Sequence, residues 1–300
     1  MKRLFLLSIA LLFAVASGAQ ETHRFAQRDT CDLYLDIWRS DSLSKPTVLY
    51  VFGGGFVEGK RNDKYNTEWF KSINTLGYSV VSIDYRLGMK GYKIGKGLSA
   101  LVKASDRFYL SQQIGVEDVF SAVAFLYEHP ELGIDVNNIV ISGSSAGAII
   151  ALASAYDFAN GKRDGLPEGF KGFRGLISFA GGIISTSGAP RFKQAPCPLL
   201  LFHGTADKAV AYRSVGAFGR GLWGSFYIAN QFKNKGWDCC IYRFKDRPHS
   251  VAAYMKYLMP YEEAFLEKIS QGATGFSLDA TIDDKTLPTF WNISTKDIYK

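Results

Sequence analysis

Cysteine, histidine and unbalanced charge are all scarce in this sequence, and each scarcity excludes a class of protein. Four cysteines in 300 residues are too few for a disulfide-built scaffold. The four histidines do not cluster with them, so we expect no metal site. The net charge of +7 is spread along the chain without a nucleic-acid-binding motif, so we expect no nucleic-acid partner. At 47% hydrophobic residues, the chain is too apolar to be disordered and has the size of a globular enzyme.

Residues 1–19 have the three parts of a secretory signal peptide. Lys2 and Arg3 give a positive start, Leu4 to Ala16 is apolar, and Ser17-Gly18-Ala19 supplies small residues for cleavage. A membrane anchor is the alternative, but this apolar run is shorter than the roughly 20 residues that a spanning helix needs. We therefore expect export to the periplasm or the extracellular space, with no stable membrane insertion once the leader is removed.

An exported chain can form disulfides, and the four cysteines leave their pairing open. Cys31, Cys197, Cys239 and Cys240 allow three complete pairings, of which a bridge between the adjacent Cys239 and Cys240 would be strained. Buried free thiols are the alternative, because cysteine packs as a small hydrophobic residue.

Apolar segments typical of buried strands alternate with helical segments over most of the remaining chain. Asp32–Trp38 alternates like a strand with one covered face, whereas Thr47–Phe52 is continuously apolar, as in a strand buried on both faces. Further strands are expected at 78–85, 138–142, 175–180, 198–203 and 240–244, and helices at 65–76, 114–127 and 146–158. This alternation predicts an α/β fold with a mostly parallel central sheet and helices on both faces.

The chain has no internal repeat or low-complexity linker, so residues 20–300 are predicted to form one domain. Two stretches fit the alternation poorly. Gly88–Gly97 carries four glycines and three lysines and is expected to be a mobile surface loop, with a role as a lid left open. The polar tail 272–300 is expected to be irregular.

The segment Gly143-Ser144-Ser145-Ala146-Gly147 matches the pattern G-x-S-x-G, with Ser145 at its centre. A nucleophilic serine at a tight turn between a strand and a helix needs small neighbours, because side chains two residues away on either side would clash. The motif follows an expected strand and opens an expected helix, as this role requires. A plain strand-to-helix turn is the alternative, and Ser144 is the rival hydroxyl.

A serine hydroxyl needs a base to take its proton, and the base needs an anion to hold its tautomer. His249 and Asp207 each follow an expected strand, which places both at the same edge of a parallel sheet as Ser145. The order Ser145, Asp207, His249 along the chain is that of one known architecture. Asp246 is a competing acid, and His203 is interpreted as part of the turn that presents Asp207.

Three consecutive glycines follow the expected strand 47–52, in the segment Phe52-Gly53-Gly54-Gly55-Phe56. Without side chains to obstruct them, the amides of this turn and of Ala146 are expected to bind the oxyanion of a tetrahedral intermediate. Donors of this kind are typically worth about 3–4 kcal/mol each. A phosphate-binding loop is the alternative, but no Walker lysine follows and the spacing is not G-x-G-x-x-G.

Five motifs occur in order along the chain: 52–56, 82–87, 134–139, 143–147 and 203–207. With them, roughly residues 30–270 resemble the α/β-hydrolases of the carboxylesterase/lipase group. The nearest members are relatives of hormone-sensitive lipase, type-B carboxylesterases, and feruloyl or acetylxylan esterases. The resemblance implies an α/β-hydrolase fold that uses no cofactor. The site residues that it implies are a triad of Ser145, Asp207 and His249 and the oxyanion donors Gly54, Gly55 and Ala146.

The chain departs from this group at Phe52, where members usually have a histidine that steadies the glycine turn. How the turn is held is therefore an open question, although its donors are backbone amides and do not depend on that side chain. Asp84 and Arg86 lie where the group has a structural polar pair and are interpreted as scaffold.

The sequence thus predicts a secreted serine carboxylic-ester hydrolase that works through an acyl-enzyme. Its expected substrates are short-chain esters or acetyl and feruloyl esters linked to carbohydrate, as small molecules or on polysaccharides. A serine peptidase like prolyl oligopeptidase would use the same order of residues but lacks room here for that group's propeller domain. A noncatalytic binding module on a hydrolase scaffold is the third hypothesis, although such proteins generally lose the serine or the histidine.

Overall fold

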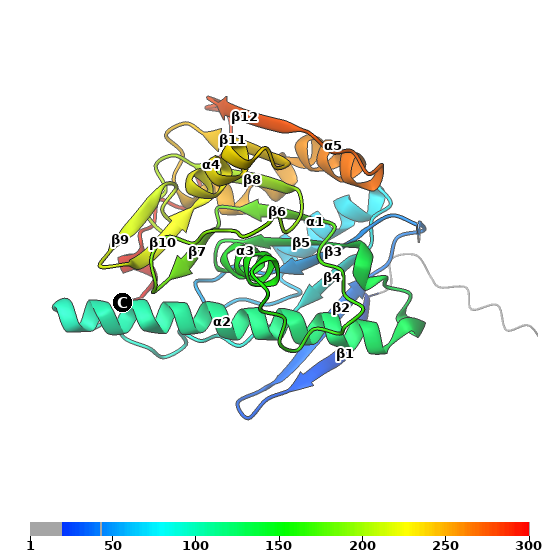
Figure 1. Ribbon diagram of the computed structural model, residues 1–300, viewed down its shortest axis with the longest axis horizontal. Helices are drawn as coiled ribbons and strands as arrows, with labels where there is room; N and C mark the ends of the chain where they lie inside the picture. The colour runs from blue at the N-terminus through cyan, green and yellow to red at the C-terminus, as the bar shows by residue number, and fades with distance from the viewer. Residues whose placement is uncertain (1–19, 43, 300) are drawn as a thin grey trace, which may run out of the picture.

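The computed structural model describes residues 20–42 and 44–299, so the expected signal peptide lies outside the described residues. A nine-stranded sheet forms the centre of the molecule, in the order β1-β2-β4-β3-β5-β6-β8-β11-β12 (Figure 1). Its strands are β1 (Gln20–Gln27), β2 (Asp32–Trp38), β3 (Thr47–Val51), β4 (Val80–Ile83), β5 (Ile139–Ser144), β6 (Gly175–Phe179), β8 (Leu199–Gly204), β11 (Cys239–Phe244) and β12 (Ser277–Ile282). Strands from β4 to β12 in this order are parallel, and β2 runs antiparallel to both of its neighbours, β1 and β4. The prediction of a mostly parallel central sheet is confirmed.

Helices cover both faces of this sheet. The helices are α1 (Lys64–Thr75), α2 (Leu98–Glu128), α3 (Ala146–Ala159), α4 (Ser225–Lys235), α5 (Met259–Ser270) and the short α6 (Thr295–Ile298). Helix α1 packs Trp69 on Tyr50 of β3, and α5 places Tyr261 beside Phe202 of β8. Helices α2 and α3 pack together on the other face (Figure 1). Every residue of β3 is buried, as its continuous apolar sequence predicts.

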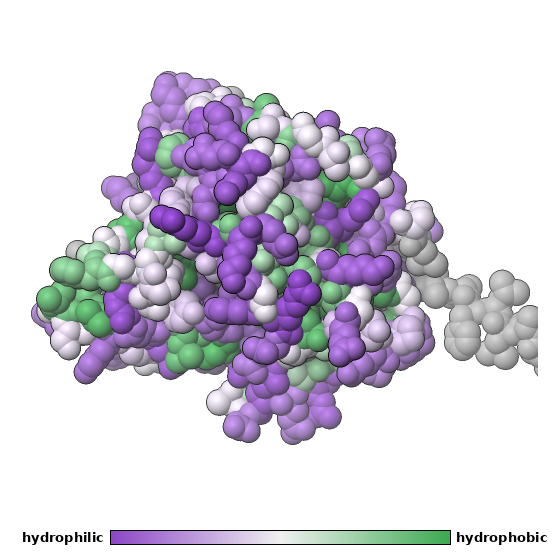
Figure 2. Space-filling model, in the orientation of Figure 1, coloured by the Kyte–Doolittle hydropathy of each residue, from purple (hydrophilic) through white to green (hydrophobic). Residues whose placement is uncertain are grey.

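A second, antiparallel sheet of three strands follows β6. It consists of β7 (Gly182–Ser185), β10 (Arg220–Gly224) and β9 (Ser214–Ala217). This sheet was not predicted: its strands are only four or five residues long, and every residue of β9 is exposed. The surface in Figure 2 is largely hydrophilic, with apolar side chains gathered over β9, β10 and the start of α2.

Two sequence expectations need correction. The helix expected at 114–127 begins already at Leu98. Its first half projects past the sheet, with Leu98 and Leu101 exposed. This half therefore lacks the apolar periodicity by which a packed helix is recognised in a sequence. The expected irregular tail contains β12, which pairs in parallel with β11, and the short α6. Strand β12 has mostly exposed side chains, so backbone pairing rather than apolar burial holds it.

The loop 88–97 is mostly exposed, as expected, but its start is tied down: Met89 is buried and donates its N–H to the Phe56 carbonyl. All four cysteines are free thiols, with Cys31 exposed and the other three buried. Within residues 20–42 and 44–299, no helix is both long and apolar enough to cross a membrane.

Candidate active site

Ser145 lies at a sharp turn between β5 and α3. Its φ of 53° is in the left-handed region, which is strained for a residue with a side chain. Its N–H donates to the Phe179 carbonyl at 2.9 Å, which holds this conformation. A methyl carbon at Gly147 would overlap the carbonyl oxygen of Val51, and one at Gly143 would overlap the backbone of Gly147. The two glycines therefore allow the turn, as the motif predicts.

Three predicted residues from three different loops meet at this turn. Ser145 Oγ lies 2.8 Å from His249 Nε2, and His249 Nδ1 lies 2.7 Å from Asp207 Oδ2. Because an ionised carboxylate only accepts, His249 carries its hydrogen on Nδ1 and presents Nε2 to the serine hydroxyl as an acceptor. This is the tautomer that a general base for Ser145 needs. All three side chains are buried or nearly so.

Asp207 is held as an anion by four donors. Its Oδ1 accepts from the N–H groups of Ala209 and Val210, each at 2.9 Å. Its Oδ2 faces His249 and also His203, whose Nε2 is 3.4 Å away. Burial by itself would raise the pKa of Asp207, but the hydrogen bonds from His203 and His249 outweigh it and hold the pKa well below its usual range.

His203 is a member of the site that the sequence interpretation used only as part of a turn. It is fully buried at the end of β8, and its Nε2 lies 3.0 Å from the Val210 carbonyl. A carbonyl can only accept, so this nitrogen carries a hydrogen that it donates to Val210, and Asp207 Oδ2 lies 3.4 Å from the same nitrogen. The sequence did contain a signal for this role. His203 is at the end of an expected strand, four residues before Asp207, so both residues were expected at the same edge of the sheet. The competing acid Asp246 is exposed, whereas Asp207 is directed at His249.

The glycine turn lies directly beside Ser145. A methyl carbon at Gly53 would be 3.1 Å from the Ser144 carbonyl oxygen and 3.4 Å from Ser145 Cβ. The Gly54 carbonyl accepts from the N–H groups of Val57 and Glu58, at 3.0 and 3.1 Å. In a trans peptide the N–H points opposite to the C=O, so the Gly55 N–H is directed out of this turn.

Ala146 contributes the third predicted donor. It is the first residue of α3, where backbone N–H groups have no partner within the helix. It also follows Ser145 directly, so its amide lies at the same turn as the serine hydroxyl. The structure thus places Ala146 at the serine turn and the glycine turn beside it, and the role of Gly54, Gly55 and Ala146 as oxyanion donors stays a prediction.

Aromatic stacking replaces hydrogen bonding at Phe52. Its ring lies 4.4 Å from that of Tyr85, at an interplanar angle of 31°. The site also contains a residue that no sequence signal indicated: the Tyr299 hydroxyl donates to the Gly55 carbonyl at 2.6 Å. The ring contact between Phe52 and Tyr85 and the hydrogen bond from Tyr299 thus hold the turn in the absence of a histidine.

Asp84 and Arg86 do not form a pair with each other, which corrects the expectation of a paired motif. Asp84 Oδ2 lies 2.7 Å from Arg61 Nη1, and Arg86 Nη2 lies 2.8 Å from Asp118 Oδ1. Both contacts link separate elements of the fold, which agrees with the interpretation of these residues as scaffold.

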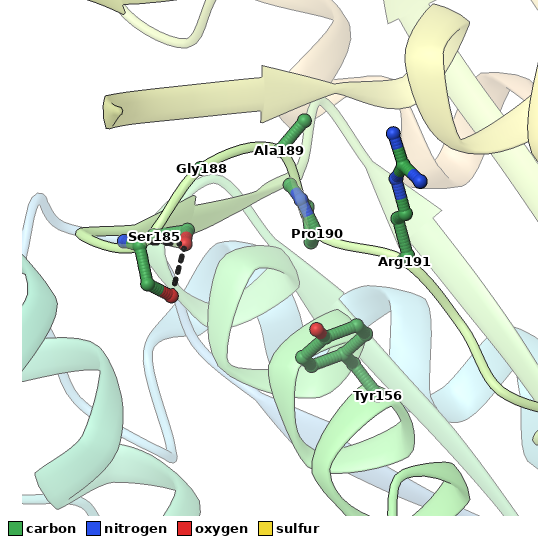
Figure 3. Close-up of a pocket in the computed structure, with 7 residues that line it drawn as sticks. Tyr156, Ser185, Gly188, Ala189, Pro190 and Arg191 are labelled. Carbon is green, nitrogen blue, oxygen red and sulfur yellow. Dashed lines mark hydrogen bonds between the residues drawn. The ribbon is translucent and has the colours of Figure 1, made fainter. Parts of the chain in front are cut away.

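A surface cavity of about 400 Å³ lies apart from this site. Figure 3 shows Tyr156 of α3 below the loop that carries Ser185, Pro190 and Arg191. Tyr156 is eleven residues beyond Ser145 on α3, which corresponds to about 16 Å along the helix. The cavity is therefore at the opposite end of α3 from the serine turn.

A parallel sheet with a serine at a G-x-S-x-G turn, an acid and a histidine on later loops, and a glycine turn beside the serine defines the α/β-hydrolase class. Within that class, a model of the Carboxylesterase family matches residues 14–166. The chain belongs to the carboxylesterase family. The matched region includes the glycine turn and Ser145 and ends before Asp207 and His249.

Individual proteins agree with this assignment. Chlorogenic acid esterase of Aspergillus niger is 30% identical over 135 residues, 42% of this chain and 24% of that protein. Phenmedipham hydrolase of Pseudarthrobacter oxydans is 30% identical over 138 residues, 44% of this chain and 25% of that protein. The match thus spans about a quarter of the length of these curated relatives. A propionate-bound esterase of Thermogutta terrifontis has a similar fold, with a TM-score of 0.57 and 21% identity, covering 83% of this chain and 94% of that one.

Proposed function

We propose that this protein is a serine carboxylic-ester hydrolase that acts through an acyl-enzyme on Ser145. One observation carries the proposal: the contacts from Ser145 Oγ to His249 and from His249 to Asp207 lie beside the glycine turn 53–55. Family membership supports the class of reaction, and the geometry supports the role of each residue.

In the first half of the reaction, Ser145 Oγ attacks the ester carbonyl carbon while His249 Nε2 takes the hydroxyl proton. The carbonyl oxygen becomes an oxyanion that the amides of Gly54, Gly55 and Ala146 stabilise. The tetrahedral intermediate then breaks its bond to the alcohol oxygen. The alcohol leaves with the proton that His249 carries, and the acyl group remains on Ser145 as an ester.

In the second half, water takes the place of the alcohol. His249 removes a proton from the water as it attacks the acyl-enzyme, and the same amides stabilise the second oxyanion. Collapse of this intermediate returns the proton to Ser145 and releases the carboxylic acid. Asp207 remains ionised throughout, because its low pKa keeps the proton on His249 and its charge stabilises the imidazolium.

The proposed substrates are short-chain esters and acetyl or feruloyl esters linked to carbohydrate, met outside the cytoplasm. A relative named for chlorogenic acid, an aromatic ester, supports the feruloyl class. The structural neighbour with bound propionate supports short acyl chains. The leader-like sequence of residues 1–19 supports export. Comparing kcat/KM for p-nitrophenyl esters of graded length, methyl ferulate and acetylated xylan would test the choice of substrate.

The function is tested by Ser145→Ala, with Ser144→Ala as the matched control. Ser144 Oγ donates to the Ala252 carbonyl at 2.6 Å, so its hydrogen is engaged within the fold, whereas the Ser145 hydroxyl contacts His249. We expect Ser145→Ala to lower kcat for p-nitrophenyl acetate at least about 10⁴-fold, because removing a triad nucleophile costs about this much or more. Ser144→Ala should keep most of the activity. Hydrolysis at the parent rate by a folded Ser145→Ala protein would overturn the proposal.

A further inference from the structure

A single segment, residues 284–299, contacts the loop of His249, the loop of Asp207 and the glycine turn. It first lies against the loop of His249: Tyr254 Oη donates to the Pro288 carbonyl at 2.7 Å, and Ser250 Oγ bonds both the N–H and the carbonyl of Trp291. The Trp291 ring lies 6.5 Å from that of His249. The segment is therefore fixed to the residues that flank the base.

The same segment next reaches the loop of Asp207 and then the glycine turn. Ser294 forms a backbone bridge with Lys208, which directly follows Asp207. At the end of this path, a methyl carbon at Gly55 would meet Ile298 Cγ2 at 2.7 Å, so Ile298 packs on the glycine. Gly55 is buried beneath this contact.

Tyr299 makes the polar contact with the turn. Its Oη donates to the Gly55 carbonyl at 2.6 Å, and its ring packs edge-on against Phe108 of α2, 4.8 Å away. Burial raises the pKa of the Tyr299 phenol, so the hydroxyl keeps its hydrogen and remains a donor over the neutral range. The contact therefore persists at any pH at which an esterase would be assayed.

Glycine has the greatest backbone freedom of any residue, so three glycines in a row need external contacts to hold their peptide planes. Val57 and Glu58 hold the plane between Gly54 and Gly55 through the Gly54 carbonyl. The next plane, which begins at the Gly55 carbonyl, is held by Tyr299. Both planes that flank the Gly55 Cα are then fixed, and with them the direction of its N–H.

We propose that Tyr299 is a positioning residue of the oxyanion turn, which acts by holding the Gly55 peptide and never touches the substrate. The proposal rests on the proposed function for its kinetic consequence, but the contact itself can be tested without turnover. We expect Tyr299 to affect the stabilisation of the transition state, because the Gly55 amide is needed where negative charge develops on the substrate oxygen.

Tyr299→Phe removes the hydroxyl and keeps the ring against Phe108. Tyr78→Phe is the matched control, because it removes a buried tyrosine hydroxyl that contacts Ser270 instead. In protein labelled with ¹⁵N at glycine and phenylalanine, we expect the order parameters of the Gly55 and Phe56 amides to fall from about 0.85 to below about 0.6 in Tyr299→Phe, because these two N–H groups belong to the peptide planes on either side of the Gly55 Cα. They should stay at the parent value in Tyr78→Phe. Unchanged order parameters in a folded Tyr299→Phe protein would overturn the proposal.

The kinetic arm uses the same two variants with p-nitrophenyl acetate. Tyr299→Phe should lower kcat about tenfold with KM within about twofold of the parent, since the lost alignment weakens a contact made in the transition state. The shape of the pH profile should not change. A rise in KM at constant kcat would contradict a positioning role. If the parent itself does not hydrolyse esters, the proposed function fails, and the order parameters still decide whether Tyr299 holds the turn.

Discussion

Two glycine-containing turns meet at the carboxyl edge of the sheet, and they are stabilised over very different distances in the chain. The turn at 143–147 is held by the strands and helix next to it, through backbone contacts with β3 and β6. The turn at 52–58 is held partly by its own hydrogen bonds and partly by Tyr299, which comes more than 200 residues later. The first turn is thus a property of its motif, whereas the second depends on where a distant segment packs.

The largest effect, a loss of kcat, is expected at Asp207, the acid of the triad, which like the serine turn could be predicted from its own stretch of sequence. Asp207→Asn removes the charge that stabilises the imidazolium and permits the wrong tautomer of His249, so kcat should fall about 10⁴-fold. Asp246→Asn is the control, because Asp246 is exposed with a φ of 55°, a conformation that asparagine adopts readily. Its kcat should stay within about twofold. Assays with p-nitrophenyl acetate would decide, and a larger loss at 246 would reverse the assignment of the acid.

Gly147→Ala tests whether backbone packing alone holds the nucleophile turn. The added methyl would overlap the carbonyl oxygens of Val51, the last residue of β3, and of Phe52 directly after it, and these buried backbone atoms have little freedom to move. We expect a loss of about 3 kcal/mol or more in the free energy of unfolding, measured by urea titration. Gly95→Ala is the control, since its methyl would approach only the side chain of Ala100, at 3.1 Å. Equal stability of the two variants would show that the backbone around the serine turn can shift to accommodate the added methyl group.

Much of this site could be predicted because its signals are local. Apolar strands alternating with helices predict a parallel sheet, and parallel strands bring their following loops to one edge, so Ser145, Asp207 and His249 could be placed together from sequence. The contact of His203 with Asp207 was not predicted, since a histidine at this position in the sequence is equally consistent with a simple turn. Tyr299 left no signal at all, because a lone tyrosine in a polar segment has neither periodicity nor a motif.

Where the two turns touch, Gly53→Ala should separate activity from stability. Its methyl would lie against the Ser144 carbonyl and Ser145 Cβ at 3.1 and 3.4 Å, tight but not overlapping, and its φ is not in the left-handed region. We expect the free energy of unfolding to change by about 1 kcal/mol or less. By contrast, kcat/KM should fall roughly 10- to 100-fold, because displacements of about 1 Å at reacting groups have effects of this size. A variant that loses stability and activity together would mean that the two turns form one structural unit.

The smallest effect is expected at His203, where local and distant support combine. Asp207 is held by amides of its own loop and by His203 from the end of β8. His203→Leu replaces the imidazole beside a buried carboxylate with a side chain that cannot donate, so the free energy of unfolding at pH 7 should fall by about 1–2 kcal/mol. His129→Leu is the control, because it changes an exposed histidine that pairs with Glu131.

The pH dependence of this difference gives the sharper test. The pKa of Asp207 is depressed in the folded state, in part by His203, so the stability that this bond contributes is fully present above the ordinary aspartate pKa of about 3.9. It is lost as the pH falls through the lower folded value, because the unfolded chain takes up its proton first. The difference in the free energy of unfolding between parent and His203→Leu, measured by urea titration, should therefore narrow as the pH falls below about 4. If this difference in the free energy of unfolding stays constant down to pH 3, His203 packs against Asp207 without stabilising its charge. Of His203 and the amides of the Asp207 loop, only the amides would then hold Asp207 as an anion.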